Sequence, residues 1–191
     1  MKVRESGMPD PEVWETFFDP EKILTTLGLT KEIKHVIEFG CGYGTFTIPA
    51  AKIVNGKITC IEVDQDMVDI TKHRAEISQL DNVEIIFADF EQSKNLLNAN
   101  SADYVMLFNI LHGENPQRLL EDTYRLLRPG AGGSLIHWNY DPDTPRGPPM
   151  DIRPRPSQLQ RLAADIGFKL SEKLDLPPYH YGFRFVKPVT T

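Results

Sequence analysis

The stretch that decides the fold is His35-Val36-Ile37-Glu38-Phe39-Gly40-Cys41-Gly42-Tyr43-Gly44. Its first five residues form a short apolar run that ends abruptly in glycines, which predicts a buried strand. The three alternate glycines let the backbone turn sharply and approach a ligand without intervening side chains. A helix is predicted over 45–54, so its free N–H groups face the same cleft and suit a carboxylate or a phosphate. The sequence therefore predicts a strand, a ligand-binding turn and a helix.

The alternation of apolar runs with helical spacing continues along the chain. Further strands are predicted over 57–63, 83–87, 104–108 and 134–138. The last two predicted strands, 169–176 and 181–186, have no helix between them, so they should pair antiparallel at one edge of the sheet. The pattern predicts an α/β fold with a doubly wound, mainly parallel sheet of about seven strands and an antiparallel C-terminal hairpin strand.

Local signals predict several helix boundaries. Asp10-Pro11 and Asp19-Pro20 each offer an N-cap followed by proline, so two short helices should precede Gly28. Either Asp64 or Asp66 is a plausible cap of the helix after the second strand. The other expectations are a short helix over 92–98, a helix opened by Asn115-Pro116 and closed by Arg128-Pro129-Gly130, and a capping-box pair of Ser157 and Gln160 before a helix that ends at Gly167.

Length and composition indicate one soluble domain of 191 residues, with 40% hydrophobic and 25% charged residues. We divide it into N-terminal helices (1–33), a cofactor-binding core (34–140), a proline-rich loop (141–156) and a C-terminal helix and hairpin (157–191). The formal net charge of −6 argues against a general affinity for nucleic acid, which needs a basic footprint.

The two cysteines, Cys41 and Cys60, form neither a disulfide framework nor a zinc motif, and buried thiols in a reducing compartment are expected. No metal site is predicted. The N-terminal stretch 1–11 lacks the apolar segment of a signal peptide, and no apolar run reaches the roughly 18 residues that a membrane span needs. A cytoplasmic protein without a membrane partner is the expectation.

The spacing of the glycines helps to choose the ligand. Dinucleotide-binding turns usually read G-x-G-x-x-G, whereas here the third glycine comes one residue early and Glu38 precedes the first by two. This segment resembles the first motif of class I S-adenosylmethionine-dependent methyltransferases. The resemblance implies a Rossmann-like fold and S-adenosylmethionine as cofactor, bound around Glu38, Gly40, Cys41, Gly42 and Gly44.

Acidic residues follow the next two predicted strands. A carboxylate at the end of the second strand can accept bonds from both ribose hydroxyls, and the strand register favours Glu62 over Asp64, which should cap the next helix. After the third strand, Asp89 and Phe90 match the family positions that bond the adenine amino group and pack on its ring. Without the resemblance, a helix cap and a core phenylalanine explain these two residues equally well.

The fourth predicted strand leads to Asn109 and His112. In the family this segment delivers its carboxyl end to the methyl donor, so Asn109 is assigned to the cofactor. His112 is a candidate general base, although a histidine that merely packs in the loop or touches the cofactor fits as well. The stretch 126–133 resembles the family's L-x-P-G-G turn but has Ala131 and an extra glycine.

Methyl transfer to a small molecule by direct displacement is the predicted function. Two alternatives stay open: an NAD(P)-dependent oxidoreductase, and a protein that binds S-adenosylmethionine without catalysis. A nucleic-acid methyltransferase is disfavoured because Asn109-Ile110-Leu111-His112 departs from the tetrapeptide of such enzymes. A protein acceptor and the oligomeric state, including a dimer, are left open.

The acceptor should be bound by the variable parts of the chain. These contain Trp14, Phe17, Phe18, Trp138, Asn139, Tyr140 and Asp141. The proline-rich loop carries Arg146, Arg153 and Arg155, which suggests a lid that meets an acidic substrate. The competing interpretation is a solvated loop that proline makes rigid.

Overall fold

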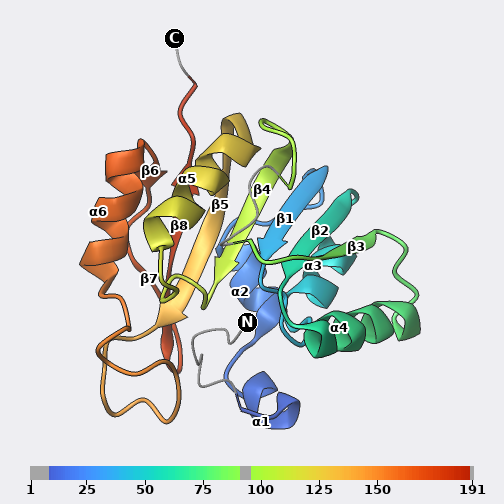
Figure 1. The fold of residues 1–191 in the computed structure, drawn as a ribbon, viewed down its shortest axis with the longest axis horizontal. Helices are drawn as coiled ribbons and strands as arrows, with labels where there is room; N and C mark the ends of the chain where they lie inside the picture. The colour runs from blue at the N-terminus through green and yellow to red at the C-terminus, as the bar shows by residue number, and fades with distance from the viewer. Residues whose placement is uncertain (1–8, 91–95, 190–191) are drawn as a thin grey trace.

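A computed structural model describes residues 9–90 and 96–189 of the chain. It contains one eight-stranded sheet with helices on both faces (Figure 1). The strands are β1 (His35–Phe39), β2 (Lys57–Glu62), β3 (Val83–Phe87), β4 (Ala102–Phe108), β5 (Leu127–Trp138), β6 (Lys169–Leu170), β7 (Leu174–Leu176) and β8 (His180–Val186). The helices are α1 (Pro11–Glu15), α2 (Pro20–Thr26), α3 (Thr47–Ile53), α4 (Gln65–Ile77), α5 (Pro116–Leu126) and α6 (Pro156–Ile166).

The strand order is β3-β2-β1-β4-β5-β8-β6, and β7 pairs with β8. The first five strands in this order are parallel, while β8 runs antiparallel to β5, β6 and β7. The order reverses between β1 and β4, which places the topological switch point beside the glycine turn. The predicted Rossmann-like, mainly parallel sheet with antiparallel C-terminal strands is confirmed.

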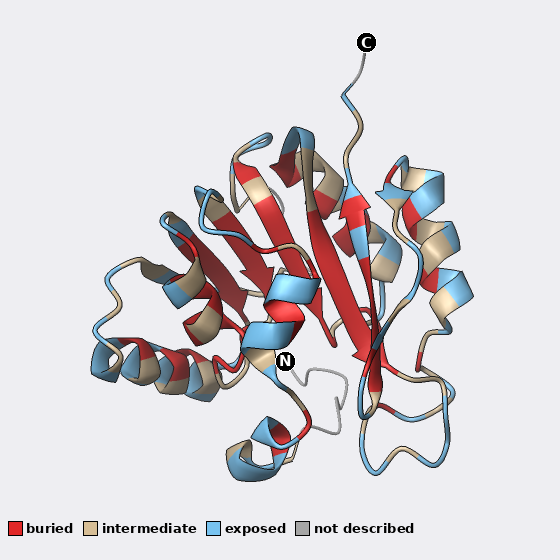
Figure 2. Cartoon of the chain, turned by 180° about the vertical axis from the view of Figure 1, so that it is seen from behind, coloured by how far each residue is buried: buried red, intermediate tan, exposed pale blue. Residues whose placement is uncertain are grey.

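Each face of the sheet has its own apolar core (Figure 2). Alternate residues of a strand point to opposite faces, so neighbours such as Val36 and Ile37 belong to different cores. One face packs against α5 and α6, through Leu120 of α5 and Leu159 of α6. The other packs against α2 and α3, through Leu24 of α2. Burial on both faces explains why the parallel strands read as continuous apolar runs.

Two predicted boundaries around β5 are wrong. The strand begins at Leu127, directly after α5, so Arg128-Pro129-Gly130 lies inside the strand and does not close the helix. Leu127 pairs with Ala102, a contact that no local sequence pattern predicts. Gly133 fits this strand because a Cβ there would lie 2.1 Å from the carbonyl oxygen of Val105. The extra glycines of this stretch therefore serve a close approach between strands.

Two further local predictions differ from the structure, and a third lies largely outside the described residues. The capping box was expected on Ser157 and Gln160, but Gln158 accepts the backbone N–H of Arg155 at 2.7 Å, because Pro156 already starts α6. The strand expected over 169–176 is split into β6 and β7, since Ser171 Oγ accepts the N–H of Arg184 there. Much of the helix expected over 92–98 falls on 91–95, outside the described residues, and no helix is assigned to 96–98.

Candidate functional site

The candidate site lies where β1, β2, β4 and β5 deliver their carboxyl ends. The glycine turn follows β1, and Gly40, Gly42 and Gly44 have φ of +74°, +51° and +75°, which L side chains rarely adopt. A Cβ on Gly40 would lie 3.0 Å from the side chain of Ile110, and one on Gly44 would lie 3.0 Å from Thr71. The turn therefore needs its glycines both for conformation and for the approach of neighbouring segments.

Glu62 ends β2 with its carboxylate directed at the glycine turn. It accepts the backbone N–H of Gly42 at 2.9 Å, of Val63 at 2.9 Å and of Asp64 at 3.1 Å. Asp64 caps α4 instead, by accepting the N–H of Asp66 at 2.9 Å. The helix cap predicted for Asp64 is confirmed, and the ribose contact predicted for Glu62 stays a prediction.

Glu38 lies beneath the turn, with only 2% of its surface exposed. Its carboxyl accepts the hydroxyl of Thr47 at 2.5 Å and the thiol of Cys60 at 3.4 Å. Burial raises the pKa of Glu38 to about 7, and the nearby Glu62 charge acts in the same direction. These contacts join β1, β2 and α3, so Glu38 stabilises the base of the glycine turn. Cys41 is buried on the same side of the sheet.

Asn109 follows β4 in a left-handed conformation, with φ of +57°. Its backbone N–H bonds the carbonyl of Ile136 at 2.9 Å, which fixes it between the ends of β4 and β5. Both polar atoms of its side chain are buried and make no hydrogen bond within residues 9–90 and 96–189. A buried amide without a partner is costly, so this position is suited to a ligand that supplies the missing bonds.

His112 is also buried and packs edge-on against His137 of β5, with ring centroids 5.5 Å apart. Burial lowers the pKa of His137 well below the usual histidine range, and the neighbouring His112, His180 and Arg153 act in the same direction. His137 is therefore neutral at physiological pH. His137 directly follows Ile136, whose carbonyl accepts the N–H of Asn109, so the two imidazole rings lie at the same ends of β4 and β5 as Asn109.

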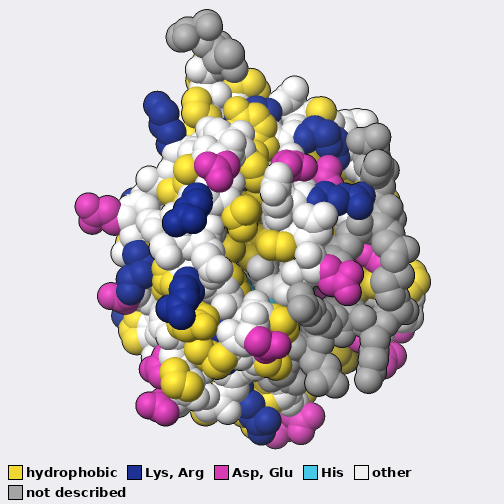
Figure 3. Space-filling model, turned by 60° about the vertical axis from the view of Figure 1, so that its left-hand side comes forward, with side chains coloured by type: hydrophobic (Ala, Val, Ile, Leu, Met, Phe, Trp, Pro, Cys, Tyr) yellow, Lys and Arg dark blue, Asp and Glu magenta, His cyan; other side chains and the backbone are white. Residues whose placement is uncertain are grey.

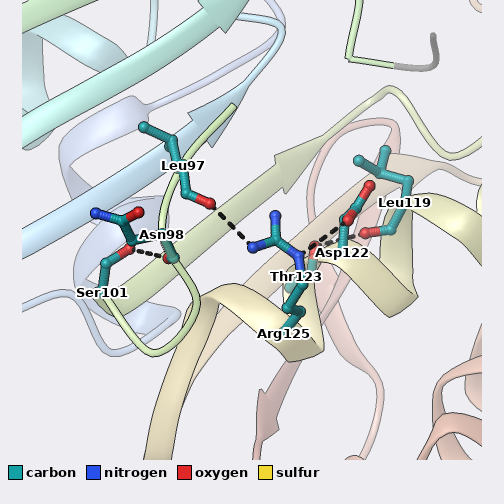
Figure 4. Close-up of polar contacts among 7 residues, drawn as sticks. All are labelled: Leu97, Asn98, Ser101, Leu119, Asp122, Thr123 and Arg125. Atoms are coloured by element: carbon teal, nitrogen blue, oxygen red, sulfur yellow. Dashed lines mark hydrogen bonds and ion pairs between the residues drawn. The ribbon is translucent and has the colours of Figure 1, made fainter. Parts of the chain in front are cut away.

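Phe90 follows β3 and packs against Phe39 of β1, with ring centroids 5.4 Å apart. Asp89 directly precedes it and is half-buried. The far end of the connection to β4 is tied to α5, because Arg125 donates to the carbonyl of Leu97 at 2.9 Å and pairs with Asp122 (Figure 4). Asp89 and Phe90 therefore stand at the edge of the site beyond β2, while Asn109 and His112 stand beyond β4.

Comparison with known proteins identifies the family. A family model described as a methyltransferase domain matches residues 36–130. A solved S-adenosylmethionine-dependent methyltransferase from Aquifex aeolicus has a TM-score of 0.82 to this chain, with 26% identity, and the match covers 93% of this chain and 94% of that one. The chain belongs to the class I S-adenosylmethionine-dependent methyltransferases.

Curated relatives match this methyltransferase over shorter spans. The ribosomal protein L11 methyltransferase of Shewanella woodyi is 29% identical over 119 residues, which are 56% of this chain and 39% of that protein. The 23S rRNA (uracil(1939)-C(5))-methyltransferase of Haemophilus parainfluenzae is 38% identical over 73 residues, which are 38% of this chain and 16% of that protein. The chain thus spans well under half the length of these relatives, whose acceptors differ from each other.

The residues present fit the cofactor of this methyltransferase family. The unpartnered amide of Asn109 lies at the carboxyl end of β4, beside the glycine turn. The turn leaves no side chain at three positions, and Glu62 already directs its carboxylate to this edge.

Among the described residues, no group of three His, Cys, Asp or Glu side chains is placed to hold a metal ion. No helix in that part of the chain is long and apolar enough to cross a membrane.

The methyltransferase also has an aromatic wall, defined here as Trp14, Phe17, Phe18, Trp138 and Tyr179. Trp14 and Phe17 lie 6.2 Å and 5.5 Å from Trp138 by ring centroid, so α1 and the residues after it pack on the end of β5. Tyr179, just before β8, contacts Phe17, and His180, the first residue of β8, contacts Trp138; neither was predicted from the sequence. No sequence motif marks these two residues. They reach the end of β5 only because β8 pairs antiparallel with β5, with His180 opposite Trp138.

Arg153 does not meet the expectation of a cation that faces an acidic substrate. Its side chain is 6% exposed, and all three of its nitrogens donate to the loop itself. The acceptors are the carbonyl groups of Asn139, Asp141, Arg146 and Pro148 and the hydroxyl of Thr144. Arg155 lies 3.9 Å over the ring of Tyr140. The segment 139–153 is therefore folded around Arg153, in agreement with the alternative of a rigid loop.

Proposed function

We propose that this chain transfers the methyl group of S-adenosylmethionine to a small-molecule acceptor by direct displacement. The observation that carries the proposal is the position of the unpartnered, buried amide of Asn109 between the glycine turn and the ends of β4 and β5. The aromatic wall and the His112–His137 pair lie on the β4–β5 side of the same position. In the proposed arrangement the cofactor and the acceptor meet at Asn109.

The sulfonium of the bound cofactor supplies a methyl carbon that is already activated for displacement. The residues of the chain then have to orient the two reactants and exclude water. Glu62 offers carboxylate oxygens to the ribose hydroxyls, and Asp89 takes the adenine amino group in the proposed arrangement. Asn109 fixes the methyl-donating end, and the aromatic wall shields it from solvent.

His112 is the proposed proton acceptor for nucleophiles that carry a proton. An oxygen nucleophile needs such a base, whereas a thiolate or a neutral amine does not. The neutral His137 ring packed against it adds no positive charge that would hinder proton uptake. A general-base role for His112 therefore belongs to this proposal and depends on the acceptor.

Two features favour a small acceptor over a polymer. The wall residues Trp14, Phe17 and Trp138 are each at most 8% exposed, which leaves no broad platform at the site. The net charge is −6, and Figure 3 shows Lys and Arg side chains scattered among Asp and Glu on one face. A polyanion would find no single-sign basic surface on that face. The acceptors named for the relatives, a ribosomal protein and an rRNA, are the competing possibilities.

Two measurements test this function. Calorimetry should show binding of S-adenosylmethionine and S-adenosylhomocysteine, and no binding of oxidised dinucleotide. Turnover of radiolabelled S-adenosylmethionine should then appear with members of a small-molecule panel containing hydroxyl, amine and thiol acceptors. Labelling of ribosomal protein or rRNA alone would overturn the small-molecule assignment. Cofactor binding without turnover on any acceptor would support the non-catalytic alternative.

A further inference from the structure

Arg74 of α4 connects two segments that are far apart in the sequence. Its Nη1 donates to the backbone carbonyl of Tyr43, inside the glycine turn, at 2.9 Å. Its Nη2 pairs with the carboxylate of Glu15, the last residue of α1, at 2.5 Å. The two terminal nitrogens of one guanidinium therefore bind the glycine turn and the N-terminal segment.

Tyr43 is held at its backbone carbonyl by Arg74 and at its side-chain hydroxyl by the segment before α1. Its hydroxyl donates to the carbonyl of Pro9 at 3.2 Å, just before α1. Its ring packs against the cluster of Trp14, Phe17 and Trp138. The preceding carbonyl, that of Gly42, accepts the hydroxyl of Thr71 at 2.8 Å. The turn and the segment 9–18 thus make a continuous set of contacts through α4.

The same segment also packs on the aromatic wall, where the proposed function places the acceptor. Trp14 and Phe17 pack on Trp138 at the end of β5, and Phe17 also contacts Tyr179 at 5.6 Å between ring centroids. Residues 9–18 therefore touch the glycine turn on one side and the ends of β5 and β8 on the other. A shift of this segment would change both regions together.

We propose that Arg74 is a positioning residue that couples the cofactor turn to the acceptor region through the segment 9–18. The inference rests on the proposed function for its two ligands. Because coupling between two binding sites is reciprocal, an acceptor that packs against the segment tightens cofactor binding by the same factor that the cofactor tightens acceptor binding. Loss of Arg74 weakens cofactor binding even though its side chain belongs to neither binding site.

The test uses S-adenosylhomocysteine as probe, so it needs no acceptor. The variants are Arg74→Met, Arg74→Lys and Glu15→Gln, with Lys57→Met as the matched control, because Lys57 pairs with Glu84 at the amino end of β2, away from the turn. Calorimetry gives the Kd for S-adenosylhomocysteine, and thermal unfolding gives Tm. The chain has two tryptophans, both in the aromatic wall, so quenching of tryptophan emission by acrylamide reports on the seating of segment 9–18.

We expect Arg74→Met to weaken S-adenosylhomocysteine binding about tenfold and Glu15→Gln about threefold, because the first loses the charged bond to Tyr43 as well as the exposed ion pair. Arg74→Lys should recover part of the affinity, and both Arg74→Met and Glu15→Gln should increase acrylamide quenching. Lys57→Met should match wild type in both measurements.

The outcomes separate this inference from the function beneath it. If wild type binds S-adenosylhomocysteine and Arg74→Met binds within twofold of it, the coupling is overturned and the proposed function stands. A lower Tm in Arg74→Met with an unchanged Kd would show a purely structural role and also overturn the coupling. If wild type itself binds no S-adenosylhomocysteine, the proposed function is overturned, and the coupling that rests on it is overturned as well.

Discussion

Glu38 should make the stability of the protein fall as pH rises from about 4.5 to about 7. The pKa of its carboxyl is about 7 in the folded chain, against 4.5 as the ordinary value, because burial disfavours the charged form. Between these two pH values the unfolded chain releases a proton that the folded chain keeps, so the folded state loses relative stability. Each pKa unit corresponds to about 1.4 kcal/mol, so the loss amounts to about 3 kcal/mol and is complete above pH 7.

The Glu38→Gln variant isolates this effect. A glutamine oxygen can still accept from Thr47 and Cys60, the two groups that bond Glu38, but it does not titrate. Urea unfolding followed by tryptophan emission should be measured at pH 5 and pH 8. The stability difference between Gln and wild type should shift in favour of Gln by about 2.5 kcal/mol from pH 5 to pH 8, because part of the effect is already lost at pH 5. Groups common to both proteins cancel in this comparison.

Glu84→Gln is the control, since Glu84 is exposed and pairs with Lys57 on the surface. This variant should show no comparable shift between the two pH values. Equal pH dependence in wild type and Glu38→Gln would refute the reasoning, because it would mean that Glu38 is ionised in the folded protein at pH 5. The support that Glu38 gives to the turn would then come from a carboxylate instead of a neutral acid.

Three further predictions follow from single contacts. Asn109→Gly keeps the positive φ but removes the amide, so calorimetry should show S-adenosylmethionine binding weakened about tenfold with Tm preserved; unchanged affinity would contradict a cofactor role for the side chain. Gly133→Ala places a Cβ against the carbonyl of Val105 and should cost about 2–3 kcal/mol in urea unfolding; a neutral effect would show that β4 and β5 can separate. Arg153→Met leaves loop carbonyls without their donors and should make 139–153 the first site of limited proteolysis; an unchanged digestion pattern would contradict this.

The strand β1 and its turn could be predicted from the sequence because their signals are local. An apolar run followed by alternate glycines specifies a buried strand and a backbone with positive φ within ten residues. The cap role of Asp64 could likewise be predicted, because an aspartate directly before a helix bonds a free N–H of its first turn. The functional conclusion depended on such local patterns and on their order along the chain.

The start of β5 and the split between β6 and β7 could not be predicted. Leu127 becomes a strand residue only because Ala102 lies opposite, and the interruption at Ser171 depends on the N–H of Arg184. Both are pairings between distant parts of the chain. The same is true of Arg74, whose partners are Tyr43 and Glu15. Helical periodicity placed this arginine on α4, but no local pattern gave its partners.

The lid hypothesis for the proline-rich loop was wrong in one instructive respect. A cluster of arginines in a loop usually indicates a solvated or ligand-binding surface, but Arg153 points inward, where the carbonyl groups of the loop take up its donors. A guanidinium that is fully used inside a loop fixes that loop and offers no N–H to an acceptor. Trp138 of β5 packs against Gly147 of the same loop. Residues 9–18 pack on the same Trp138 through Trp14 and Phe17, so the loop and the N-terminal segment meet at one side chain, and release of either would expose buried aromatic surface.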